Sequence, residues 1–187
     1  MIPGPVSHVA IPVDEKGERT IVVIADDKLD QVSISGLPIE ADDIVAFVIW
    51  RNNFVKDLEI AHNAGAITVV GSAALTDPQV LRADYLIGSR DDFSGDYSVE
   101  QALTRFTYVV VTSGAEGATF YSAKGSIFQP AEEAEVVDTT GAGDAFLSAL
   151  LHYLVINKTI DAKAMALAAR WSALTVSSQG SIPPRFA

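Results

Sequence analysis

The most informative segment of this chain is Glu135-Val136-Val137-Asp138-Thr139-Thr140-Gly141-Ala142-Gly143-Asp144-Ala145-Phe146. It predicts a short strand that runs into three small residues and then into a helix. Apolar residues recur at helical spacing after the turn, at Ala145, Phe146, Ala149, Leu150, Tyr153 and Leu154. One face of the helix is therefore expected to be buried, and that burial holds the start of the helix in place.

The turn before this helix has the chemistry of an anion site. The first N–H groups of a helix lack internal partners, and the helix dipole makes that end positive. Gly141, Ala142 and Gly143 leave the backbone open to a transferring phosphoryl group. Asp144, at the same end, is placed to accept a proton from an attacking hydroxyl. The same residues also suit a plain helix cap, and Gly-x-Gly alone is a weak motif, so both interpretations stay open on the residues alone.

Around this stretch, apolar runs alternate with amphipathic segments, which predicts an α/β fold with a mostly parallel sheet and helices on its faces. Buried strands are predicted over residues 44–50, 66–70 and 108–112, and a weaker strand over residues 85–87. Helices are predicted over residues 52–62, 78–83, 98–106, 142–156 and 161–177. Two hairpins and a connecting loop complete the pattern, over residues 8–13 with 20–24, 117–122 with 126–129, and 26–43.

The composition indicates an acidic globular protein. The 187 residues suffice for one sizeable domain, and nearly half of them are hydrophobic. The net charge of −11, with 13 Lys and Arg scattered among 24 Asp and Glu, argues against nucleic acid as a partner. No apolar run is long enough to cross a bilayer, and the absence of cysteine excludes disulfides and thiolate metal sites. We therefore expect a cytoplasmic protein with no membrane association.

The nine residues 138–146 resemble the C-terminal signature of the PfkB, or ribokinase-like, carbohydrate kinases. Residues 111–118 are similar to the strand and turn that line the family's nucleotide site, and residues 168–184 to its closing helix and Gly-x-x-x-Pro tail. The early hairpin resembles the lid over the sugar. The resemblance implies a ribokinase-like three-layer fold, truncated at the N-terminus, in one domain over 1–187. Its parts would be a remnant of the β lid at about 6–25 and a nucleotide-binding and catalytic part at 44–187.

The resemblance also implies roles for individual residues. Asp144 would be the catalytic base, and the backbone of Gly141, Ala142 and Gly143 would form the anion hole. Contacts with the nucleotide, or with a monovalent cation beside the anion hole, are implied for Thr112, Gly114, Gly117, Asp138 and Thr140. The implied cofactors are ATP and Mg²⁺, with K⁺ as a candidate activator.

One departure from the family pattern concerns the magnesium site. The family carries Asn-x-x-Glu after the strand matched here by residues 85–87, and its acid helps to organise magnesium and phosphate. This chain has Ser89 in place of the asparagine, and Asp92 is the nearest stand-in for the glutamate. Ketohexokinase-like members resemble this Ser-basic-Asp pattern. A solvated approach to a helix is the alternative interpretation of the acids here.

A second departure is the absence of the family's first strands and helices, which grip the sugar. We therefore expect an exposed apolar sheet edge, covered by a second copy of the chain or by a complementing chain. The function expected by resemblance is ATP-dependent phosphorylation of a hydroxyl on a sugar or similar alcohol. The alternatives are a catalytically inactive member that binds nucleotide, and an interaction scaffold.

Overall fold

The computed structural model of the protein describes residues 8–10, 22–25, 32–93 and 97–180. The chain forms two compact units, residues 1–35 and 36–187, and each is described by itself. In the first unit, β1 (His8–Ala10) pairs antiparallel with β2 (Val22–Ala25). These two strands fall within the predicted early hairpin. The turn of that hairpin and the adjoining ends of its strands, residues 11–21, lie outside the described residues.

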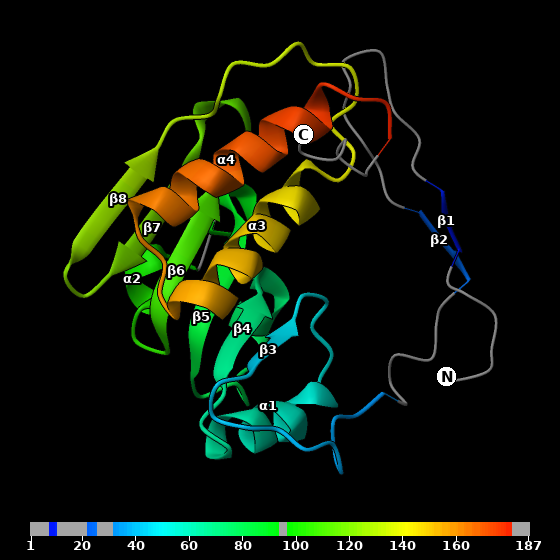
Figure 1. Cartoon of the computed structure of the whole chain (residues 1–187). Helices are drawn as coiled ribbons and strands as arrows, with labels where there is room; N and C mark the ends of the chain where they lie inside the picture. The colour runs from blue at the N-terminus through cyan, green and yellow to red at the C-terminus, as the bar shows by residue number, and fades with distance from the viewer. Residues whose placement is uncertain (1–7, 11–21, 26–31, 94–96, 181–187) are drawn as a thin grey trace. The chain divides into compact units, whose positions relative to one another are not determined.

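The second unit is built on a six-stranded sheet in which spatial order follows chain order (Figure 1). The first four strands pair in parallel and the last two are added antiparallel as a hairpin. The strands are β3 (Ile44–Phe47), β4 (Ile67–Gly71), β5 (Ala83–Ser89), β6 (Phe106–Thr112), β7 (Ala118–Ser122) and β8 (Gly125–Gln129). The predicted α/β architecture with a mostly parallel sheet is confirmed.

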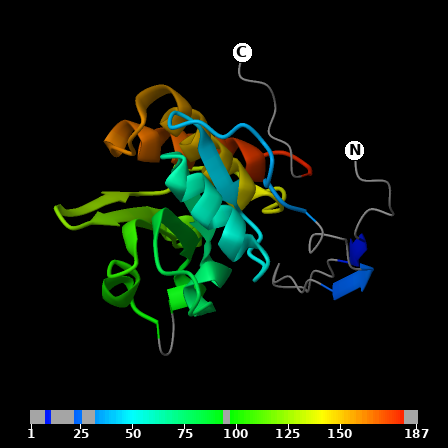
Figure 2. The ribbon, with the colours of Figure 1, turned by 90° about the horizontal axis from the view of Figure 1, so that it is seen from below.

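Helices cover both faces of this sheet. Figure 2 shows α3 (Ala142–Asn157) and α4 (Ala162–Val176) together on one side. The helices α1 (Phe54–Asn63) and α2 (Val99–Ala102) lie on the other side. α1 connects β3 to β4 and α2 connects β5 to β6, and right-handed connections between parallel strands that advance in one direction place their helices on the same face. Among the described residues, none of the helices has the length and apolar character needed to cross a bilayer.

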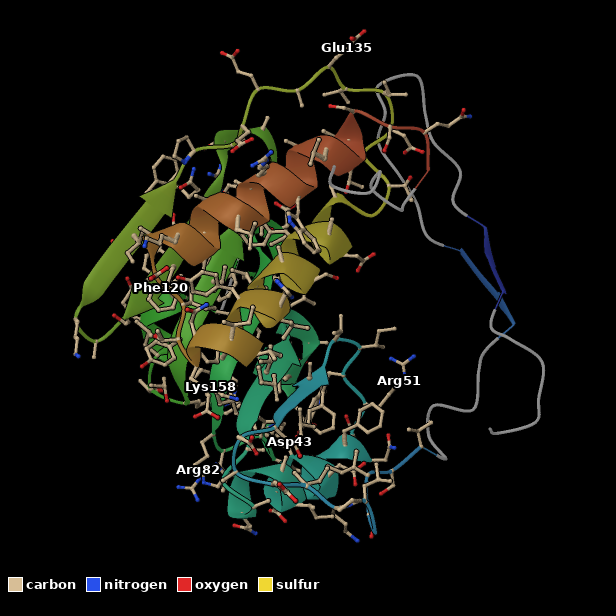
Figure 3. All side chains as sticks on the ribbon, in the orientation of Figure 1. Asp43, Arg51, Arg82, Phe120, Glu135 and Lys158 are labelled. Atoms are coloured by element: carbon tan, nitrogen blue, oxygen red, sulfur yellow. The ribbon has the colours of Figure 1, made fainter. Side chains whose placement is uncertain are left out.

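The core between the sheet and the α3–α4 pair is continuous and apolar. Leu150, Leu154 and Met165 are fully buried there, each contributing about 1.5–3 kcal/mol from burial. In the same core, Tyr108 stacks between Tyr85 and Phe120, with ring centroids 4.7 Å and 5.4 Å away. Phe120 is labelled in Figure 3. Burial raises the pKa of Tyr85 to about 12, and the neighbouring Tyr108 is the second largest cause of this rise. The phenol of Tyr85 therefore stays protonated at neutral pH.

The first strand of the sheet differs from its prediction. The apolar run 44–50 predicts a strand buried on both faces, but β3 ends at Phe47 and lies at the sheet edge. Val48 and Ile49 are 46% and 57% exposed. The chain turns back into the core at Trp50, whose indole Nε1 donates to Asp77 Oδ2 at 3.0 Å.

Two predicted helices also differ. Residues 78–83 form no helix; a 3₁₀ helix, η2 (Ser72–Thr76), stands before them instead. The helix predicted over 98–106 is reduced to α2, although Ser98 and Gln101 form its capping box. Strand pairing ends it, because Phe106 already lies opposite Ala83 in the β5–β6 ladder.

The guanidinium of Arg105 organises the irregular segment between η2 and β5. Its Nε donates to the Val80 carbonyl oxygen at 2.8 Å, and Nη1 donates to that of Leu75 at 2.7 Å. Its Nη2 donates to the carbonyl oxygen of Asp77 at 2.6 Å. The backbone groups of this segment therefore find their partners in one side chain rather than in a helix.

Replacing Arg105 with methionine should lower the free energy of unfolding by about 2 kcal/mol, because several carbonyl groups lose a charged donor. Urea denaturation followed by circular dichroism measures the change. The matched control is Arg82→Met on the same segment, where the side chain is exposed (Figure 3). Equal losses in the two variants would show that the carbonyl contacts of Arg105 do not stabilise the fold.

Candidate active site

The segment that leads into α3 is tied to the end of α4. Residues 131–137 form no strand, contrary to the prediction of a short strand over 135–137. Instead, the N–H groups of Val137 and Asp138 both donate to the Val176 carbonyl oxygen, at 2.7 Å and 3.1 Å. The last turn of α4 thereby takes the place of a neighbouring strand and sets the path of the chain into the glycine turn.

The side chain of Asp138 shapes this turn. Its Oδ1 accepts from the N–H of Thr140 at 2.8 Å, and its Oδ2 accepts from the N–H of Gly180 at 3.2 Å. The N–H of Ala142 donates to the Thr139 carbonyl oxygen at 3.3 Å. Gly141 then takes a φ of 81° and a ψ of 0°, a left-handed conformation that strains any residue with a Cβ. Asp138 thus holds the turn against the chain that follows α4.

The first turn of α3 presents an open backbone. Gly143 and Asp144 follow Ala142 at the positions whose N–H groups lack intrahelical partners. A Cβ added to Gly143 would meet no atom of the protein within 4 Å. Packing within the chain therefore does not require a glycine at this helical position, and the open space leaves the backbone accessible to a ligand. The side chain of Asp144 is exposed at the same end.

A pocket of about 380 Å³ opens beside this turn. Three parts of the chain form its walls: the end of β6 with the following 3₁₀ helix η4 (Gly114–Glu116), the segment 131–139, and the facing sides of α3 and α4. The lining residues with polar side chains are Thr112, Glu132, Thr139 and Ser172, and most of the others are glycine or alanine. Small residues leave the space open, and Phe146 closes its floor as a buried apolar side chain.

The structure brings together five of the ten predicted site residues as lining residues of this pocket: Thr112, Gly114, Gly117, Ala142 and Gly143. Gly141 and Asp144 flank the last two in the chain, and Asp138 and Thr140 belong to the preceding turn. Asp92 stands apart, in the 3₁₀ helix η3 (Arg90–Phe93) after β5.

The carboxylate of Asp92 belongs to the same edge of the sheet as the pocket. Its Oδ2 accepts from the N–H and the Oγ of Ser89, at 2.7 Å and 2.9 Å. Ser89 in turn pairs with Thr112, which lines the pocket. Over the part of the chain that the structure describes, no group of three acidic or histidine side chains forms a metal cage. A single carboxylate still fits Mg²⁺ that is held mainly by substrate phosphates and water.

The wall that α4 contributes is absent from the sequence predictions. Ala169, Ser172, Ala173 and Val176 line the pocket, and they follow the helical spacing i, i+3, i+4, i+7. In the sequence, these residues form a stripe of mostly small side chains next to the buried face of α4. This stripe becomes a pocket wall only because residues of the segment 131–136 line the same pocket.

The model of the family described as pfkB family carbohydrate kinase matches residues 51–185. The 5-dehydro-2-deoxygluconokinase of Bacillus licheniformis is 36% identical over 91 residues, 43% of this chain and 28% of that protein. The deoxyribokinase of Salmonella typhimurium is 36% identical over 72 residues, 38% of this chain and 23% of that protein.

Solved structures of kinases share the fold. The aminoimidazole riboside kinase of Salmonella enterica, complexed with aminoimidazole riboside and an ATP analog, matches with a TM-score of 0.67 and 24% identity, over 81% of this chain and 62% of that chain. The Arabidopsis thaliana ribokinase complexed with ribose and ATP matches with a TM-score of 0.73 and 20% identity, over 96% of this chain and 66% of that chain. The chain thus has a ribokinase-like fold and spans less than two thirds of the length of these proteins.

Proposed function

Because this chain belongs to the pfkB family of carbohydrate kinases, we propose that it transfers a phosphoryl group from ATP to a hydroxyl of a sugar or similar small molecule. The observation that carries the proposal is the first turn of α3. There an open glycine backbone, a carboxylate and a pocket lined by small residues meet at one helix end. Phosphoryl transfer needs this combination of an anion cradle and a base.

Each part of the site has its own role in the proposed transfer. ATP supplies the phosphoryl group and lies along Thr112, Gly114 and Gly117 in the pocket. The N–H groups at Gly143 and its neighbours, at the positive end of α3, stabilise the charge that develops on the transferring group. Asp144 accepts the proton of the acceptor hydroxyl, which makes that oxygen a stronger nucleophile.

Two cations belong to the proposal. Asp92 would help to hold Mg²⁺ beside the phosphates, in the role of the family's glutamate but with a shorter side chain. K⁺ would lie beside the turn of Asp138 and Thr140. Both oxygens of the Asp138 carboxylate already accept backbone hydrogen bonds, so oxygens of the turn itself, such as the Thr140 carbonyl, are the better candidates for that ion.

A second candidate function is nucleotide binding without catalysis. It is favoured by the Ser89–Asp92 contact, because an acid that caps its own loop is less available to a metal than a free one. The third candidate is an interaction scaffold. It would bind a partner through the exposed side chains of Val48 and Ile49 after β3 and would bind no nucleotide.

Calorimetric titration of ATP with Mg²⁺ and K⁺ tests the proposal. The wild-type chain should bind ATP, and Gly143→Val should weaken binding at least about tenfold, because its methyl groups enter the open space at the helix start. The variant should keep its thermal stability, since valine is a better helix former than glycine and its Cβ would stand in open space.

The control for this titration is Ser148→Val, an exposed position further along the same helix, which should bind ATP like the wild type. Assays of phosphoryl transfer to a panel of sugars and related alcohols then separate the candidates. Binding with transfer supports the kinase, binding without transfer supports the inactive member, and no binding leaves the scaffold.

A further inference from the structure

An arginine–glutamate pair joins two loops at the carboxyl edge of the sheet. Arg90 opens η3 after β5, and Glu116 closes η4 after β6. The guanidinium Nη1 donates to Glu116 Oε1 at 2.6 Å, and Nη2 donates to Oε2 at 2.5 Å, so the pair is bidentate. The side chains are 57% and 66% exposed. The hydrogen bonds and the charge of Arg90 lower the pKa of Glu116, so both groups are charged at neutral pH.

This ion pair stands next to the pocket. Gly114 and Ala115, the two residues before Glu116, line the pocket. On the other side, Ser89 precedes Arg90 and pairs with Thr112, which also lines the pocket. The loops that carry the ion pair therefore border the end of the pocket that includes the strand termini.

The charges at the pocket do not match the ligand of the proposed function. Its lining contains one charged side chain, Glu132, and no Lys or Arg. The chain as a whole has a net charge of −11. The positive end of α3 supplies only a partial charge, of about half an elementary charge, against the several negative charges of a nucleoside triphosphate. Apart from the Mg²⁺ and K⁺ of the proposed function, a positively charged side chain that binds the phosphates has to come from outside this lining.

Arg90 meets that need without breaking the fold. Its partner is another exposed side chain, and surface ion pairs contribute little to stability, so the guanidinium can exchange one anion for another at small cost. Its planar fork suits phosphate oxygens as well as it suits a carboxylate. By contrast, Arg105 donates to the backbone of residues 75–80, and Lys158 donates to the Asp42 carbonyl oxygen at the far end of α3 (Figure 3).

We propose that Arg90 is a phosphate-binding residue that leaves Glu116 and binds the phosphates of the nucleoside triphosphate when the pocket is occupied. This inference rests on the proposed function, because it concerns the same nucleotide. Glu116 acts as a competitor of the phosphates for the guanidinium and orients it while the pocket is empty.

Calorimetric titrations with ATP and with adenosine test this role in the wild type, Arg90→Ala, Arg90→Lys and Glu116→Gln. Arg90→Ala should weaken ATP binding about tenfold and leave adenosine binding unchanged, because only the phosphates lose a partner. The ATP affinity of Arg90→Lys should lie between those of the wild type and Arg90→Ala, because lysine keeps the positive charge but loses the planar, bidentate guanidinium. Glu116→Gln should bind ATP at least as tightly as the wild type, because the competing carboxylate is gone.

Two results would overturn the inference while the proposed function stands. One is unchanged ATP binding by Arg90→Ala. The other is an equal loss of ATP binding in Arg90→Ala and Glu116→Gln, with adenosine affected alike, which is the signature of a structural tie between the loops. A wild-type chain that binds neither ligand would instead reject the proposed function, and the role of Arg90 with it. Thermal melting of each variant shows whether the fold is kept.

Discussion

Asp144→Asn should lower the kcat of phosphoryl transfer by about 10²–10⁴, the usual contribution of a general base. The amide keeps the size and the place of the side chain in the first turn of α3 but does not take up the proton of the acceptor hydroxyl. ATP binding should change little, since the N–H groups that hold the phosphates belong to the backbone. Initial rates over a series of acceptor concentrations, together with calorimetry of ATP, measure the two effects separately.

Glu135→Gln is the matched control for this prediction. Glu135 is an exposed acid on the segment that leads into the turn and is absent from the pocket lining (Figure 3). It should keep the wild-type kcat. Wild-type turnover by Asp144→Asn would reject the assignment of the base. A wild-type chain that binds ATP and phosphorylates no acceptor would support the inactive member in place of the kinase.

Gly117→Ala should lower the free energy of unfolding by about 3 kcal/mol or more, and ATP binding should weaken with it. Gly117 has a φ of 118°, and a Cβ there would overlap the carbonyl oxygen of Gln129. It would also stand 2.8 Å from Ala131 N and Pro130 Cα. These atoms are backbone, so the strain can be relieved only by moving β8 and the pocket wall that follows it. Urea denaturation and ATP calorimetry measure the two losses.

Gly125→Ala separates backbone strain from overlap in this test. Gly125 has a similar φ of 127°, but a Cβ there would meet no atom within 4 Å. Its variant should lose only about 1 kcal/mol, from strain alone, and should bind ATP like the wild type. If both alanine variants lose the same stability, the contact between Gly117 and the chain after β8 is not what requires the glycine.

Elements with strong local signals were predicted well. The prediction of helices over 142–156 and 161–177 agrees with α3 and α4 to within one residue at each end. Apolar spacing marks the length of these helices, and the Asp161 side chain caps α4 by accepting from the N–H groups of Lys163 and Ala164. The Gly-Ala-Gly turn was found for the same reason, because a helix start is encoded by neighbouring residues.

Elements whose ends depend on distant partners were predicted less well. The helix over 98–106 was cut short because β6 pairs with β5 from Phe106 onward. The strand over 135–137 is absent because its backbone bonds to the end of α4 instead of to a strand. The helix over 78–83 gave way to a segment whose carbonyl groups bind Arg105. In each case, a long-range hydrogen bond outweighed a local preference of a few tenths of a kcal/mol per residue.

Periodicity and capping over short stretches are enough to predict the fold class, the two long helices and the glycine turn with Asp144. By contrast, the pocket wall formed by α4 and the segment 131–136, and the contact of Arg90 with Glu116 beside it, become visible only in the folded chain. Such contacts join residues far apart in the chain. No local pattern encodes them, because the sheet order and the packing of helices on the sheet bring them together.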